Sequence, residues 1–205
     1  MKKRSLDDKR AKLLDAASRM LERDGFQQFK VAELAREASV SISTIYTFFG
    51  SKEGIYLAYI GARADELFAA LDGFRSEDPL ERLKHYVAIV SDMAEQGRFV
   101  LEEGVRDNPL FFNTTTNEFP DRARQLYGFL AARFREINPE LGEEEALKLG
   151  YGFNGHLHGY IQHWVGAGGV LRDLTEGLCE TFVCLAMHCY GDRRGPKQTK
   201  REAGK

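Results

Sequence analysis

The sequence predicts an all-α fold, with a small N-terminal three-helix domain and a larger C-terminal helical domain. Apolar residues recur at helical spacing along the chain, and no segment shows the period-two alternation typical of a strand. Helix-start signals such as Asp78-Pro79 divide the chain, because Asp is a good N-cap and Pro suits the first helical position. The 205 residues are 43% hydrophobic and 29% charged, as in ordinary globular proteins.

The first predicted helix begins at Asp7 or Asp8, runs to about Asp24 and ends at Gly25. Its inner face carries apolar residues at helical spacing, namely Leu13, Leu14, Ala17, Met20 and Leu21. Phe26 and Phe29 follow, and we expect them to fill the space beneath the next two helices.

Residues 30–55, KVAELAREASVSISTIYTFFGSKEGI, predict two short helices joined by a tight turn. Ser41 is a good N-cap for the second helix. The apolar positions expected to be buried are Val31, Leu34, Ala35 and Ala38 in the first helix and Ile42, Ile45 and Phe49 in the second. Ser43, Thr44, Tyr46, Thr47 and Phe48 are then left outward or lateral. This is the layout of a helix-turn-helix that reads the DNA major groove, although a helical hairpin within an all-helical core is an alternative.

The chain resembles the TetR (tetracycline repressor) family of one-component transcriptional regulators over roughly residues 8–57. The matching pattern is Phe26, Val31 to Ala38, Val40-Ser41, Thr44-Ile45-Tyr46, Phe49 and Ser51-Lys52-Glu53. Three positions depart from the family pattern: Lys30 replaces a Thr or Ser cap, Ser39 replaces a turn glycine, and Phe48 replaces a frequent His. The resemblance implies a repressor that a small-molecule effector releases from a palindromic operator.

The same resemblance implies a set of DNA contacts on the second helix and just after it. Thr44, Tyr46 and Lys52 are expected to bind phosphates, which set the register. Ile42, Ser43 and Thr47 are expected to contact base edges or methyl groups, with Ser41 as the cap and Phe48 near a thymine methyl or a sugar. The alternatives are a rim position for Tyr46, a surface lysine for Lys52 and plain packing for Ile42.

Charge is distributed unevenly, although the formal net charge is only −2. Residues 1–55 carry +3, residues 192–205 carry +4, and residues 56–191 therefore carry −9. A basic domain on an acidic body suits a DNA-binding protein, but +3 on 55 residues is also unremarkable. Lys2, Lys3 and Arg4 either reach a minor groove or belong to a disordered terminus, and we expect a basic disordered tail at 192–205.

The remaining elements are predicted to be helices that form one body. We expect the domains to be 1–52 for DNA binding, 53–191 for effector binding and dimerisation, and 192–205 for the tail. The predicted body helices run from about Ser51 to Phe74, from Pro79 to Gly97, from Arg98 to Arg106, from Pro120 to Ile137, from Glu143 to Val165 and from Asp173 to Tyr190. Residues 108–118 are expected to form a loop or a short helix.

Four glycines, Gly150, Gly152, Gly155 and Gly159, interrupt one predicted helix at a cost of about 1 kcal/mol each relative to Ala. Close approach of another helix would offset this cost, although a bend or room for a ligand is the alternative. In the family, the last two helices of each subunit form the dimer interface. The resemblance therefore implies a homodimer whose interface includes Gly155, Gly159, Leu178, Phe182 and Leu185.

The body is also expected to bind an unknown small-molecule effector, although aromatic residues at helical spacing are more often core. The residues expected in the effector pocket are Tyr86, Met93, Phe99, Phe111, Phe112, Tyr127, Phe153, His156 and Trp164.

Catalysis, metal binding and membrane insertion are not expected. The sequence contains no nucleophile elbow, phosphate-binding glycine loop or zinc signature. His156 and His158 are two residues apart and point apart on a helix, and the three cysteines form no CxxC pair. We therefore expect no enzyme, no cofactor and no metal. Without an apolar run of membrane length or a signal peptide, we expect a cytoplasmic protein. The second hypothesis is a helical ligand-binding or dimerisation module whose head no longer binds DNA.

Overall fold

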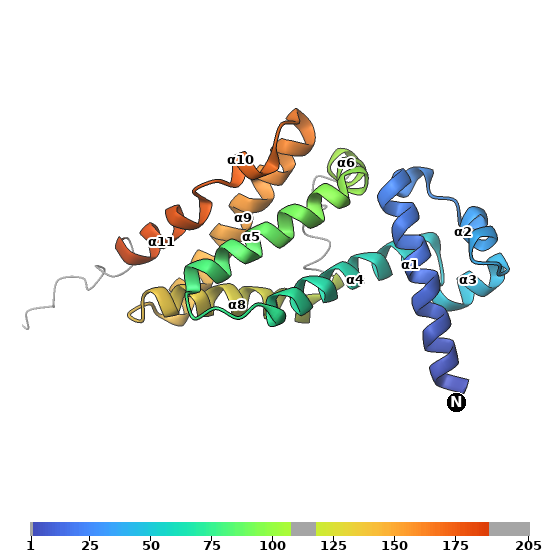
Figure 1. The fold of residues 1–205 in the computed structure, drawn as a ribbon, viewed down its shortest axis with the longest axis horizontal. Helices are drawn as coiled ribbons and strands as arrows, with labels where there is room; N and C mark the ends of the chain where they lie inside the picture. Colours follow the sequence, from blue (N-terminus) through green and yellow to red (C-terminus); the bar gives the residue numbers. More distant parts are fainter. Residues whose placement is uncertain (1, 108–117, 189–205) are drawn as a thin grey trace, which may run out of the picture.

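The computed structural model describes residues 2–107 and 118–188, and helices are the regular elements within those ranges (Figure 1). The helices form a small N-terminal group at one end of the molecule and a larger bundle beside it. Helix α4 runs from the first group into the second. The predicted all-α architecture is therefore confirmed.

The N-terminal group consists of α1 (Lys2–Gln28), α2 (Val31–Glu37) and α3 (Ile42–Phe49). Helix α1 begins earlier than the predicted Asp7 or Asp8, so Lys2, Lys3 and Arg4 are helical rather than a disordered arm. The backbone leaves helical geometry at Gly25, where φ is 76°, as its position predicted. The three helices enclose a hydrophobic core that includes Leu13, Ala17, Met20, Leu21, Phe29, Leu34 and Ile45.

The larger bundle follows from α4 (Lys52–Gly73) onward. Its other helices are α5 (Pro79–Gln96), α6 (Arg98–Asp107), α8 (Pro120–Ile137), α9 (Glu143–Ala167), α10 (Leu171–Thr175) and α11 (Leu178–His188). The side chains of Leu83, Tyr86, Leu130, Phe134 and Phe153 form its fully buried centre. Helix α8 has the predicted bounds, and the carboxylate of Asp78 caps α5 by accepting from the Leu80 amide at 2.8 Å.

The last predicted helix is wrong in one respect. A single helix was expected from Asp173 to Tyr190, but α10 ends at Thr175 and α11 starts at Leu178. Gly177 has φ of 74° in the intervening turn, a conformation that glycine adopts without strain and that ends a helix. The tail at 192–205 and Phe111 and Phe112 lie outside the described residues.

The N-terminal group and the bundle are joined by more than the chain connection at α4. Ile55 and Tyr59 of α4, and Val100 of α6, belong to the N-terminal hydrophobic core. The Gln27 amide donates to the Glu103 carboxylate at 3.0 Å, and α6 packs along α1. These contacts make α4 and α6 a joint through which a change in the bundle reaches the N-terminal helices.

Candidate nucleic-acid interface and internal cavity

Helix α3 starts at a cap that its own sequence supplies. The Ser41 hydroxyl accepts from the Thr44 amide at 3.1 Å and lies 2.8 Å from the hydroxyls of Ser43 and Thr44. Ser39 takes a positive φ of 52° in the preceding turn, where the family pattern has glycine. Lys30 makes no side-chain cap for α2, as the missing Thr or Ser predicted.

One side of α3 is buried and the other is open to solvent. Ile45 and Phe49 pack into the N-terminal core, whereas Tyr46, Ser43 and Thr47 are exposed. The Thr47 hydroxyl donates to the Ser43 carbonyl at 2.8 Å, which leaves the hydroxyl oxygen able to accept another bond. Helix α3 lies at the edge of the molecule in Figure 1, so its exposed side is not covered by the bundle.

Ile42 of α3 differs from the sequence-based expectation, whereas Phe48 agrees with it. Ile42 was expected to be buried, but it is 42% exposed because it is the first residue of α3 and extends past the edge of a small core. Phe48 was expected to point outward or sideways, and it lies sideways, half-buried against that core with its ring centroid 6.5 Å from that of Phe49. Thr44 is likewise half-buried.

Two cations lie beside the ends of the helix-turn-helix. The Lys52 ammonium sits 4.5 Å from the Phe26 ring centroid and donates to the Gln27 carbonyl at 3.4 Å. The Arg10 guanidinium lies 5.2 Å from the ring centroid of Phe49 at the end of α3. Sequence reasoning missed Arg10, although its place three residues before Leu13 puts it on the core-facing side of α1.

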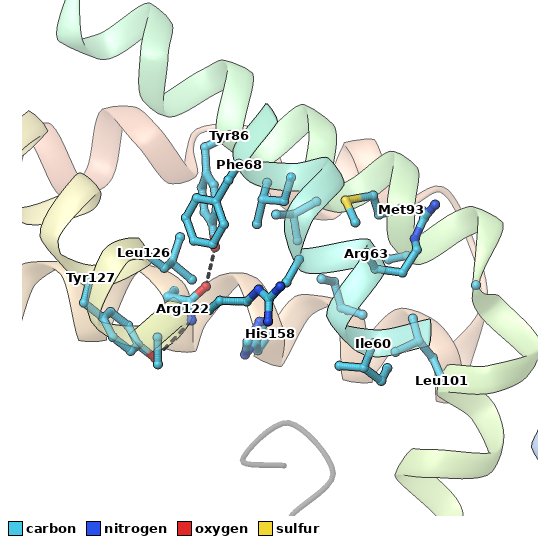
Figure 2. Close-up of a pocket in the computed structure, with 18 of the residues that line it drawn as sticks. Ile60, Arg63, Phe68, Tyr86, Met93, Leu101, Arg122, Leu126, Tyr127 and His158 are labelled. Carbon is cyan, nitrogen blue, oxygen red and sulfur yellow. Dashed lines mark hydrogen bonds between the residues drawn. The ribbon is translucent and has the colours of Figure 1, made fainter. Parts of the chain in front are cut away.

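The larger bundle contains a partly open cavity of about 360 Å³ between α4, α5, α6, α8 and α9 (Figure 2). This volume is at the lower end of the range for small-molecule sites, about 300–1,000 Å³. Tyr86, Met93 and Tyr127 line the cavity as expected.

Four other described residues that were expected to form a pocket, Phe99, Phe153, His156 and Trp164, do not line this cavity. Phe99 is 54% exposed, and Phe153 is fully buried among the rings of Tyr86, Phe134 and Phe182. Trp164 is buried beneath Arg98, whose guanidinium lies 4.7 Å from its ring centroid. His156 is exposed on another side of α9, where its ring contacts Phe182.

A hydrogen-bonded polar chain occupies one wall of the cavity. The Tyr86 hydroxyl donates to the Asn154 side-chain oxygen at 2.5 Å, and the Asn154 amide donates to the Tyr127 oxygen at 3.3 Å. Burial raises the pKa of Tyr86, so this phenol stays protonated. Burial also lowers the pKa of His158 to about 4, so the imidazole is neutral at pH 7.

The polar residues Asn154 and Arg122 were missed as pocket residues. Their signal in the sequence is a polar side chain within an otherwise apolar helix face. Asn154 follows Phe153 in the middle of α9, and Arg122 lies one turn before Leu126 on α8. The Arg122 guanidinium donates to Asp65 through Nε at 3.1 Å and through Nη2 at 2.5 Å.

Comparison with known proteins identifies the group to which these features belong. Residues 13–59 match the family model described as bacterial regulatory proteins, tetR family. The chain belongs to the TetR family. It is 26% identical over 187 residues to the HTH-type transcriptional regulator BetI of Brucella anthropi, an alignment that covers 87% of this chain and 93% of BetI.

Two further comparisons differ in what they support. RutR of Escherichia coli, another HTH-type transcriptional regulator, is 27% identical over 120 residues, which are 56% of this chain and 57% of RutR. A TetR-family regulator from Streptomyces coelicolor has a TM-score of 0.69 at 16% identity, over 87% of this chain and 80% of that one. The second likeness shows a shared fold. This TetR-family chain is a helix-turn-helix, DNA-binding transcriptional regulator.

The glycines of α9 in this TetR-family regulator fall into two kinds. A Cβ at Gly150 would meet the Cβ of Leu130 at 3.3 Å, and one at Gly152 would meet the Phe182 ring at 3.3 Å, so both permit close packing within the chain. A Cβ at Gly155 or Gly159 would meet no atom within 4 Å among the described residues. These two glycines therefore leave an open strip along α9.

The residues expected at a dimer interface also fall into two groups, one packed within the chain and one on the open side of α9. Leu178 and Phe182 are 3% and 4% exposed and pack inside their own chain, which corrects their predicted place at the interface. Leu185 is half-buried against the same core. Gly155 and Gly159, with His156, Tyr160 and His163, border a shallow groove on the outside of α9.

Neither a metal site nor a membrane-spanning helix is found in the part of the chain that the structure describes. No group of three His, Cys, Asp or Glu side chains there has an arrangement that could hold a metal ion. Within residues 2–107 and 118–188, no helix combines the length and the apolar character needed to span a bilayer. Cys179 is buried, which raises the pKa of its thiol to about 12, and so it remains an unreactive thiol near neutral pH.

Proposed function

We propose that the regulator is a homodimeric repressor that leaves a palindromic operator when a small molecule enters the cavity. The observation that carries this proposal is the exposed face of α3, where Ile42, Ser43, Tyr46 and Thr47 lie above a buried Ile45. Hydroxyl, aromatic and aliphatic groups on one open helix face suit contacts to phosphates, base edges and thymine methyl groups.

The roles on this face follow from exposure. Ile42, Ser43 and Thr47 read base edges or methyl groups, and Tyr46 binds a phosphate with Thr44 beside it. Ser41 orients the helix as its cap, and Phe48 supports α3 from below. Lys52 binds phosphate by extending from its place over the Phe26 ring, since such an exposed contact is worth only about 0.5–1 kcal/mol.

We assign residues 1–52 to DNA binding, residues 53–191 to effector binding and dimerisation, and residues 192–205 to a basic tail. The open strip of Gly155 and Gly159 on α9 is the dimer face, because glycine lets a partner helix approach closely. A dimer places two α3 helices on successive major grooves, about 34 Å apart.

The cavity is coupled to DNA binding through the joint between the two parts. Tyr59, Arg63 and Val100 line the cavity. Val100 and Tyr59 are also buried in the N-terminal core, and the Arg63 guanidinium lies 3.7 Å from the Glu22 carboxylate of α1. An effector that displaces any of these side chains shifts α1 and with it α3. DNA affinity then falls by at most the factor by which the effector binds the displaced state more tightly than the DNA-binding state.

Enrichment of random duplexes on the full-length chain tests the DNA-binding part of this proposal. We expect a palindrome to be enriched by the wild type and lost in Tyr46→Ala, because Tyr46 is 43% exposed and lies on the reading face. Phe99→Ala is the matched control, since it removes a comparably exposed ring from α6, and it should keep the palindrome. Absence of enrichment at low salt would contradict the proposal and favour a helical ligand-binding or dimerisation module.

A further inference from the structure

The charged side chains that line the cavity are basic, and the described carboxylates that pair with them are not lining residues. Among the described residues that line it, the side chains charged at pH 7 are Arg63 and Arg122, and none is a carboxylate. The Arg63 guanidinium is turned toward the joint, where it donates to Glu66 at 2.7 Å and to Gln96 at 3.0 Å. Arg122 is therefore the cation available to a molecule inside the cavity.

Arg122 can bind a second anion at little cost. Its two hydrogen bonds to Asp65 use Nε and Nη2, and within the described residues Nη1 has no hydrogen-bond partner. The Asp65 side chain is 66% exposed, and an ion pair at such a surface contributes only about 0–1 kcal/mol. The guanidinium is thus free either to keep Asp65 and add a ligand oxygen through Nη1, or to exchange one carboxylate for another.

Tyr127 presents a directed donor to the same space. Its oxygen already accepts from the Asn154 amide, whose own oxygen is occupied by the Tyr86 hydroxyl. Because the Tyr127 oxygen is the acceptor in this hydrogen bond, its hydroxyl proton remains available to an acceptor in the cavity. Arg122, Leu126 and Tyr127 all come from α8 and all line the cavity, so the guanidinium and the phenol belong to the same wall.

The other end of the cavity is apolar except for Arg63, whose guanidinium already donates to Glu66 and Gln96. Figure 2 shows Tyr127 and Leu126 at one end, Arg122 and His158 in the middle, and Ile60, Met93 and Leu101 at the far end. A ligand that fills the cavity therefore meets polar donors on one side and aliphatic and thioether groups on the other.

We propose that the cavity binds a small organic anion: a monocarboxylate with an unbranched apolar tail. The carboxylate accepts from the Arg122 guanidinium and the Tyr127 hydroxyl, and the tail packs among Ile60, Met93 and Leu101. This ligand is the effector of the proposed repressor, and to that extent the inference rests on the proposed function.

Other ligand classes fit the same wall less well. Tyr59, Phe68 and Tyr86 offer aromatic faces to a cation, but Arg122 would repel it and no lining carboxylate compensates. A neutral alcohol would fill the apolar end and forgo the charge-assisted bond to Arg122, which is about twice as strong as a neutral hydrogen bond.

Isothermal titration of the full-length chain in the absence of DNA tests the ligand class. The probes are hexanoate, octanoate and decanoate, with octanol and octyltrimethylammonium as matched neutral and cationic compounds. We expect at least one carboxylate to bind about tenfold or more tightly than octanol, with no measurable binding of the ammonium ion.

Arg122→Gln should weaken carboxylate binding about tenfold or more and leave octanol binding unchanged. Arg124→Gln is the matched control, because it removes an exposed guanidinium from the same helix that pairs with Asp121 outside the cavity. Tyr127→Phe keeps the ring, removes the donor, and should weaken carboxylate binding about fivefold. Thermal unfolding of each variant verifies that it is folded.

Three results would overturn the inference: no carboxylate binds, octanol or the ammonium ion binds as tightly as octanoate, or Arg122→Gln behaves like Arg124→Gln. Duplex enrichment on the same preparation separates this failure from failure of the proposed function. If a palindrome is enriched but no carboxylate binds, only the proposed ligand class is rejected. If carboxylates bind through Arg122 but no palindrome is enriched, the proposed repressor function is rejected and the proposed ligand class of the cavity is kept.

Discussion

The two hydrophobic cores of the chain serve function in opposite ways. The N-terminal core is filled by apolar residues such as Leu34 and Ile45, and the proposed contacts lie outside it on the open face of α3. The bundle core contains a polar chain through Asn154 and borders a partly open cavity of about 360 Å³, so its candidate site lies between helices. A site on one helix face depends on local pattern, whereas a site inside a bundle depends on how five helices pack.

The largest effect is expected in the core of the bundle. Phe153→Ala should destabilise the bundle by about 3–5 kcal/mol, because it empties a fully buried ring position. Phe99→Ala, at an exposed position, should change stability by less than about 0.5 kcal/mol. Urea unfolding followed by circular dichroism measures both. Similar values for the two would show that Phe153 is not a core residue.

Two isoleucines of α3 should distinguish the effect of a substitution on stability from its effect on DNA binding. Ile45→Ala is expected to cost about 2–5 kcal/mol, because Ile45 is fully buried. Ile42→Ala should cost less than about 0.5 kcal/mol, since Ile42 is 42% exposed, yet it should weaken binding to the enriched duplex. Unfolding and fluorescence-anisotropy titrations distinguish the two. A large loss of stability in Ile42→Ala would place that residue back in the core.

Removing the buried end of the hydrogen-bonded chain from Tyr86 through Asn154 to Tyr127 should lower the stability of the bundle. Tyr86→Phe leaves the Asn154 oxygen without its donor and should destabilise the bundle by about 1–3 kcal/mol. Tyr127→Phe removes a hydroxyl that is half-buried, and it should cost less. Thermal unfolding compares the two variants. Equal stability of Tyr86→Phe and the wild type would argue against the hydrogen bond to Asn154.

The smallest effects concern glycines that differ in backbone geometry. Gly177→Ala should destabilise the chain by about 1–2 kcal/mol, because φ is 74° there. Gly155→Ala lies within helix α9 with open space around it and should raise the stability of the isolated chain by up to about 1 kcal/mol. Sedimentation measures whether Gly155→Ala also weakens self-association, as a dimer face at α9 requires.

Much of the N-terminal part was predictable, because its signals are local. Ser41 and Ser51 each cap the helix that follows through a bond to the backbone amide three residues ahead. Gly25 breaks α1 where its sequence position predicted. Ile42 was mispredicted because helical spacing gives the direction of a side chain but not the extent of the core beneath it.

The bundle was less predictable, because its helices have apolar residues on more than one side. Phe153 and Trp164 were expected in a pocket and lie in the core, while Leu178 and Phe182 were expected at an interface and pack within the chain. Spacing identifies residues that avoid water, but it does not distinguish a neighbouring helix, a cavity and a partner subunit as what covers them.

The sequence by itself determined most of the helices, the cap at Ser41 and the helix-turn-helix, because hydrogen bonds and apolar periodicity within a few residues encode them. Only the tertiary structure decided where the cavity lies and what chemistry it offers. Arg122 and Tyr127 come from α8, Asn154 from α9 and Tyr86 from α5, and no local pattern links them. They meet because the packing of the helices leaves a space between them, and a space has no sequence signal of its own.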